Sequence, residues 1–165
     1  MREYGDYIRE TKRLLQNYSK MKVAALNLTE EIKAQEMLLR DESIASIQYG
    51  DDRIGGGTRE LTTTEAAVVR RIKMEVHITD MRIRRDEIER TIRAIDRAFE
   101  SLGDADVELL QGRYMRGQSW TEIAEVWNYT EKWVRDKGGK ALRDVALMLF
   151  GVIVKPAQLK IKFEN

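Results

Sequence analysis

Hydrophobic side chains recur along residues 7–102 at the spacing of a coiled coil. A first series alternates steps of four and three residues and contains Tyr7, Thr11, Leu14, Tyr18, Met21, Ala25, Leu28, Ile32, Gln35 and Leu39. A second series repeats the spacing, with Arg85 as its charged interruption, and contains Met74, Ile78, Met81, Arg85, Ile88, Ile92, Ile95, Phe99 and Leu102. Such steps keep one helix face apolar over many turns, so the pattern predicts two long α-helices.

A glycine-rich segment, "SIQYGDDRIGGGTRELTTTE", separates the two series. Gly50 and the triplet at 55–57 break a helix, and the threonines at 62–64 offer N-caps for the helix that follows. The triplet lacks the lysine of a Walker phosphate loop and is interpreted as a turn. Residues 1–102 are therefore predicted to form an antiparallel helical hairpin with its tip near residues 50–58.

Further apolar residues lie outside these two series. They are Val68, Val69, Ile72, Val76 and Ile83 in the second helix and Leu15, Leu26 and Leu38 in the first. Two helices alone cannot bury both stripes, so a third helix must cover the remainder. It comes either from the rest of the chain or from a second copy, and a homo-oligomer formed through the hairpin is the favoured interpretation.

The segment after the hairpin begins with a short predicted helix. Gly103 ends the long helix, Asp104 is expected to cap "DADVELLQGRYMRG", and Gly117 closes it. Arg116 falls in its last turn, a position suited to a contact with the backbone of a nucleic acid.

The next stretch predicts a short helix, a tight turn and a longer helix. "SWTE" is a capping box, in which Ser119 and Glu122 satisfy each other's backbone amides, so a helix is expected to begin at Trp120. Asn128 tolerates the left-handed conformation of a tight turn, and Thr130 can cap the helix that follows. Residues 103–150 are therefore predicted to be a helix-turn-helix module, which makes the whole chain all-α apart from its tail.

All three tryptophans of the chain lie in this module. The predicted inward positions are Ile123, Ala124, Trp127, Tyr129 and Val134. Trp127 is assigned to the core and Trp120 to packing at the start of the short helix, whereas Trp133 is expected to face outward.

Basic residues are concentrated in the same module, although the whole chain has 29 Lys and Arg against 28 Asp and Glu. Residues 112–143 contain seven basic and four acidic side chains, an excess of three positive charges. A helix-turn-helix presents such side chains to the DNA major groove. The predicted DNA-binding residues are Arg116, Ser119, Thr130, Glu131, Lys132, Trp133, Arg135, Asp136 and Lys140. The alternative is an ordinary helical bundle whose charged face is solvated.

The stretch "LLQGRYMRGQSWTEIAEVWNYTEKWVRDKGGKAL" resembles region 4 of bacterial sigma factors. The matching steps, in order, are Ile123-Ala124, Val134-Arg135 and Lys140-Ala141-Leu142. With the upstream hairpin and its glycine tip, the arrangement resembles phage-encoded sigma-like late-transcription regulators of the RinA and ArpU type. Three residues depart from that pattern, because Gly138 and Gly139 interrupt the second helix and Lys137 stands where the family has an apolar residue.

The resemblance implies a phage or prophage transcription regulator that reads a promoter element. Its expected partners are double-stranded DNA and the host RNA polymerase. A DNA-packaging recognition subunit similar to small terminases is one alternative, and a helical scaffold or adaptor without DNA binding is another.

Other features narrow the function class. The chain has no cysteine and a single histidine, His77, and no catalytic triad, carboxylate pair or metal-ligand set is apparent, so neither an enzyme nor a cofactor is expected. No signal peptide or membrane span is recognisable, which predicts a protein of the bacterial cytoplasm. In the tail, residues 151–165, Pro156 separates two short β-like runs that are expected to form a small hairpin or a partner-binding strand.

Overall fold

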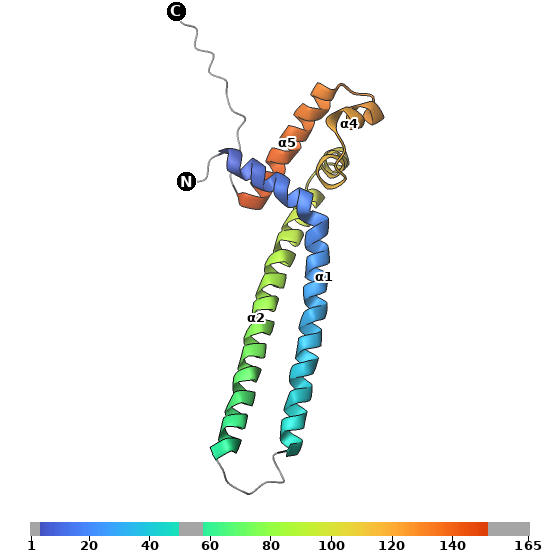
Figure 1. Cartoon of the computed structure of the whole chain (residues 1–165). Coiled ribbons are helices and arrows are strands. Elements are labelled where there is room, and N and C mark those ends of the chain that lie inside the picture. The colour runs from blue at the N-terminus through green and yellow to red at the C-terminus, as the bar shows by residue number, and fades with distance from the viewer. Residues whose placement is uncertain (1–3, 50–57, 152–165) are drawn as a thin grey trace, which may run out of the picture. The chain divides into compact units, whose positions relative to one another are not determined.

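The computed structural model describes residues 4–49 and 58–151, and all regular elements within these ranges are helical (Figure 1). The predicted all-α class is confirmed for this part of the chain. The glycine triplet at 55–57 and the β-like tail lie outside the described residues.

The helices divide between two compact units. In chain order they are α1 (Tyr4–Tyr49), α2 (Thr58–Glu100), α3 (Asp104–Leu110), a π-helical segment η1 (Gln111–Met115), α4 (Trp120–Trp127) and α5 (Glu131–Phe150). The central unit comprises Met21–Arg90, and the terminal unit comprises Met1–Lys20 together with Thr91–Asn165.

In the central unit, α1 and α2 contact each other through heptad positions. Ile32, Ile78 and Met81 are buried together, and Leu28 and Leu39 pack against them. Apolar side chains at this spacing bury one stripe of each helix, which is the main source of stability for long helices in water.

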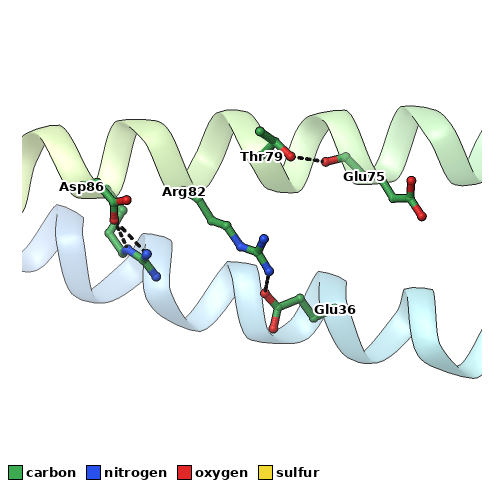
Figure 2. A network of polar contacts seen from close by, with 6 residues as sticks. Glu36, Glu75, Thr79, Arg82 and Asp86 are labelled. Atoms are coloured by element: carbon green, nitrogen blue, oxygen red, sulfur yellow. Dashed lines mark hydrogen bonds and ion pairs between the residues drawn. The ribbon is translucent and has the colours of Figure 1, made fainter.

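Polar contacts accompany this seam. Arg82 of α2 points toward α1 and donates to the carboxylate of Glu36 (Figure 2). Arg85, the charged residue of the second heptad series, donates to Asp86 at 2.8 Å, and this hydrogen bond raises the pKa of the Arg85 guanidinium. The charge in the seam is thus satisfied by the adjacent residue.

The start of α2 differs from the sequence prediction. The helix begins at Thr58, so the threonines at 62–64 lie within it instead of capping it. The segment that follows the glycine triplet contains neither Gly nor Pro, and threonine within a helix costs only a few tenths of a kcal/mol relative to good helix formers, roughly 0.7 at most. The helix can therefore start directly after the triplet.

The core of the terminal unit combines residues from helices that are distant in sequence. Its fully buried side chains include Thr11, Leu15, Ile95, Leu109, Leu110, Val134 and Val145. The buried hydroxyl of Thr11 donates to the carbonyl of Tyr7 at 2.8 Å, so it carries no unsatisfied hydrogen bond. The Tyr7 ring lies 5.4 Å from that of Phe150, which joins the beginning of α1 to the end of α5.

The region 103–117 also differs from prediction. Gly103 is the N-cap of α3 and makes no side-chain cap, while Asp104 lies inside the first turn, where a carboxylate interacts favourably with the helix dipole. The helix does not continue regularly to residue 116, because α3 ends at Leu110 and the π-helical turn follows, with Arg116 N donating to Gln111 O at 2.9 Å.

Gly112 lies in this wide turn, close to the residues that lead into α4. A Cβ at residue 112 would lie 2.6 Å from Gln118 Oε1 and 3.5 Å from Ile123 Cδ1, so the backbone of η1 approaches the entry to α4 closely. The amide of Gln118 donates to the carbonyl of Gly112 at 3.0 Å. The wide turn thus lies close to the entry to α4.

Candidate nucleic-acid interface

The start of α4 is fixed by the capping box that the sequence predicts. Ser119 Oγ accepts from the amide of Glu122 at 3.1 Å, and the amide of Ser119 donates to Glu122 Oε2 at 2.6 Å. These bonds, first from the backbone and then from the side chain of Ser119, lower the pKa of the Glu122 carboxyl. The helix begins at Trp120, as predicted.

The turn between α4 and α5 occupies residues 128–130. Asn128 adopts the left-handed conformation, with φ 56° and ψ 40°, and the amide of Tyr129 donates to the carbonyl of Ala124 at 3.1 Å. Thr130 then caps α5 by accepting from the amide of Trp133 at 3.3 Å. One residue with a left-handed backbone and one cap therefore reverse the chain within three residues.

The two helices pack on a small apolar cluster. Leu109, Ile123, Ala124 and Val134 are buried in it, and Trp120 and Trp127 pack against it from partly buried positions. The small side chain of Ala124 in α4 is buried in the same cluster as Val134 of α5.

Gly138 permits a second close approach. A Cβ at this residue would lie 2.5 Å from Trp120 Cη2, closer than real Cβ atoms come, and 3.0 Å from Leu109 Cδ2, which is a tight contact. The indole of Trp120 therefore rests on the backbone of α5, which accounts for the tryptophan and the glycine together. At Gly139 a Cβ would meet only Arg143 Nη1, at 3.6 Å, so no close contact requires glycine there.

The structure corrects the prediction for Tyr129. Its side chain is 53% exposed and does not face inward. It stacks on Trp133, with ring centroids 4.0 Å apart and an interplanar angle of 14°. The left-handed Asn128 turns the chain so that the Tyr129 ring meets the outward Trp133 ring four residues later.

The presence of a lysine at position 137 is explained by the side chains that surround it. Its ammonium lies 2.8 Å from Asp106 Oδ1 and 5.7 Å from the centroid of the Trp133 ring. A lysine at this position thus places its charge between a carboxylate of α3 and the exposed aromatic pair, where an apolar residue would leave Asp106 without its cation.

One face of α5 points to solvent and is mainly basic. Lys132, Asp136, Lys140 and Arg143 follow steps of four, four and three residues and so share this face. Lys132, Asp136 and Lys140 are exposed and Arg143 is half-buried. The opposite face consists of Val134, Gly138, Ala141, Leu142 and Val145, all buried.

Several of the predicted DNA-binding residues are engaged within the protein. Arg135 forms an ion pair with Glu131 one turn earlier, and Glu131 also accepts from the hydroxyl of Thr121 at 3.1 Å. Arg116 forms an ion pair with Glu108. The hydroxyls of Ser119 and Thr130 are helix caps. Lys132, Trp133, Asp136 and Lys140 are exposed on α5.

A cationic pocket includes residues that the sequence interpretation did not assign. It has a volume of about 300 Å³ and lies in the terminal unit. Lys12 of α1 lines it together with Arg135 and Arg143 of α5, and the aromatic side chains of Tyr114 and Trp120 form part of its wall. Three cations around a space of this size suit a phosphate group.

Burial raises the pKa of the Tyr114 phenol, so this hydroxyl stays protonated and can donate a hydrogen bond. Lys12 was missed because it occupies a polar position of the first heptad helix, far from α5 in sequence.

Among the described residues, no group of three or more His, Cys, Asp or Glu side chains is placed to hold a metal ion. None of the helices in those ranges has both the length and the apolar character of a membrane span.

Comparisons with protein-family models, with curated proteins and with solved structures find no match to this chain. The case for a function therefore rests on the residues described above.

Proposed function

We propose that the chain is a sequence-specific DNA-binding protein, a phage or prophage transcription regulator whose α4 and α5 act as a sigma region 4-like helix-turn-helix. The observation that carries the proposal is the exposed face of α5. Three of its four members, Lys132, Lys140 and Arg143, are basic, and the helix is held by a capped left-handed turn. The major groove of B-DNA is about 12 Å wide and admits an α-helix, so this face could read base edges.

The pocket beside α5 supports the proposal in a second way. Lys12, Arg135 and Arg143 gather there, next to the exposed face. A recognition helix needs phosphate contacts on its flank to fix its register on the duplex. A DNA phosphate held by Lys12 and Arg143 would supply such a contact, which leaves Arg135 at the pocket edge for a base contact.

The α1 and α2 segments complete the proposed architecture. The buried cluster of Ile32, Ile78 and Met81 and the ion pair between Glu36 and Arg82 support an antiparallel helical hairpin in the central unit. In the proposed function this hairpin supplies contacts to other proteins, with host RNA polymerase as the expected partner.

The test is to sequence the fragments that the purified full-length chain retains from fragmented phage and host DNA. A regulator should enrich a short common motif, and the complex should weaken steeply with salt because phosphate contacts release counterions. Retention of no DNA at about 50 mM salt would remove the proposal and leave the scaffold or adaptor. A ring of many copies that retains a single phage site would favour the packaging subunit instead.

A further inference from the structure

An uncovered apolar stripe runs along α2 on a different face from the seam with α1. It consists of Val69, Ile72, Val76, Thr79 and Ile83, which follow steps of three, four, three and four residues. The four aliphatic members are 49%, 53%, 56% and 52% exposed, in chain order. The residues that contact α1, such as Ile78 and Met81, lie between them in sequence and are buried.

The spacing of the stripe shows what kind of surface would cover it. Steps of three and four are those of a coiled-coil seam, which is covered by a helix with the same repeat. On α1 the exposed apolar residues Val23, Leu26 and Met37 are interrupted by Glu30 and Lys33 at the intervening heptad positions. The stripe on α2 of a second copy is therefore a better partner for this stripe than the exposed face of α1.

We infer that the stripe docks against the same stripe of a second copy, antiparallel, with the two-fold axis passing beside His77 and Ile78. In this register Ile72 faces Ile83 of the second copy, and Val76 faces Thr79 of the second copy. Val69 lies at the end of the shared seam, opposite Asp86 of the second copy. Each layer occurs twice because the interface is isologous. The inference goes beyond DNA binding and does not depend on it.

Charge complementarity selects this register. In an antiparallel coiled coil, heptad position e of one helix faces position e of the other, and position g faces position g. This places Lys73 opposite Asp80 of the second copy and Glu75 opposite Arg82 of the second copy. Both contacts join opposite charges, and symmetry makes four of them. In a parallel pair Glu75 would instead face Asp80 of the second copy, a like-charge contact that also occurs twice.

The contacts of these side chains within one copy are compatible with the inference. Glu75 Oε1 accepts from Arg71 at 3.1 Å, and Arg82 donates to Glu36. The Arg71 and Glu75 side chains are 52% and 51% exposed, and that of Arg82 is 52% exposed. Glu75 has a second carboxylate oxygen and Arg82 has further N–H groups, so each can bind across the interface without losing its present partner.

The first experiment measures the mass of the full-length chain by sedimentation equilibrium, without DNA. We expect a dimer of the 19.2 kDa chain. Val76→Asp should weaken dimerisation by at least about 100-fold, because each dimer contains the buried charge twice. The matched control is Val23→Asp on α1, since Val23 and Val76 are equally exposed at 56%. It should leave the dimer intact, and far-UV circular dichroism should show unchanged helix content for both variants.

The second experiment tests the register by exchanging charges. Lys73→Glu and Asp80→Lys should each weaken the dimer about 10-fold, because each creates like-charge contacts twice. The double variant re-forms the opposite-charge pair and should return to within about threefold of the wild type. Failure of the double variant to recover overturns the antiparallel register.

A wild-type chain that stays monomeric at about 100 μM, or a Val76→Asp chain with an unchanged mass, overturns the docking of a second copy on this stripe. The dimer is measured without DNA, so its absence leaves the DNA-binding proposal untouched, and loss of DNA binding leaves the dimer untouched.

Discussion

At the scale of single residues, adjacent positions of α5 have different environments. Gly138 lies under the indole of Trp120, whereas Gly139 faces the surface pocket. A glycine within a helix costs up to about 1 kcal/mol relative to alanine, so each must be judged by what a methyl group would meet. The two glycines therefore form a natural matched pair.

Gly138→Ala should destabilise the protein and Gly139→Ala should stabilise it. At residue 138 the new Cβ would lie 2.5 Å from Trp120, and overpacking of this kind costs about 1 to 3 kcal/mol, more than the gain in helix propensity. At residue 139 the nearest atom is 3.6 Å away, so the free energy of unfolding should rise by about 0.4 to 1 kcal/mol. Urea unfolding of the two variants measures both. Equal changes in the same direction would contradict the packing of Trp120 on Gly138.

Arg135 and Arg116 form a second matched pair, because each is exposed and ion-paired with a glutamate of its own chain. Arg135→Ala should cost roughly 1 to 3 kcal/mol on the preferred DNA site and little on random duplex, as expected for a base contact. Arg116→Ala should weaken binding to both duplexes alike, as expected for a backbone contact. Competition binding on the two duplexes measures the difference. If Arg135→Ala leaves the ratio of specific to random affinity unchanged, Arg135 acts on phosphate from the pocket that it shares with Lys12.

At the scale of elements, the caps of α4 and α5 give the module its shape. Ser119, Asn128 and Thr130 act within three or four residues of their own position, through hydrogen bonds or backbone conformation. Losing one cap leaves backbone amides unsatisfied at that helix end, at a cost of about 0.5 to 2 kcal/mol.

The capping box predicts a pH-dependent contribution to stability. The hydrogen bonds from Ser119 lower the pKa of Glu122 in the folded chain. Ionised Glu122 therefore stabilises the folded chain above its unfolded pKa of about 4.3. This contribution is lost as the pH falls through the folded-state pKa. Glu122→Gln should therefore lower stability at pH 7, and this loss should shrink as the pH falls below about 4.3. Urea unfolding at pH 7 and at a series of lower pH values measures this. The control is Glu125→Gln, on the exposed side of the same helix; an equal loss there would mean that general charge is responsible.

The sequence predicted elements whose signals are local and missed features that depend on tertiary contacts. The N-cap of α4 at Ser119 and the turn at Asn128 follow from the residues themselves, and the structure has both. The exposed Tyr129 was assigned inward, because only the path of the chain after Asn128 brings its ring onto Trp133. Lys12 could not be connected with Arg135 from sequence, since their proximity requires α1 to pack on α5.

The π-helical turn η1 was also missed, for a related reason. From sequence alone, a helical segment with one internal glycine is predicted to be a continuous helix. The close contact of Gly112 with Gln118 and Ile123 arises only in the folded unit. Periodicity predicts which residues are helical, but it does not predict where packing widens a turn.

At the scale of the whole molecule, the DNA-binding proposal and the dimer proposal together predict how many DNA-binding modules each complex contains. A chain that dimerises through α2 would carry two α4–α5 modules, each with the basic face formed by Lys132, Lys140 and Arg143. Two modules neutralise twice as many phosphates as one. The salt dependence of binding therefore reports on both proposals together.

A single module that places about four to six basic side chains on phosphates should give a log–log slope of roughly −4 to −5 with salt, and a dimer that engages both modules should give about twice that. Val76→Asp should restore the single-module slope, because the variant removes the second copy without changing the basic face of α5. Fluorescence anisotropy with a labelled duplex at several salt concentrations measures the slopes, with Val23→Asp as the control that keeps the steeper value. A slope near zero in the wild type contradicts DNA binding through phosphate contacts. Equal steep slopes in the wild type and in Val76→Asp would mean that the module binds DNA without help from the second copy.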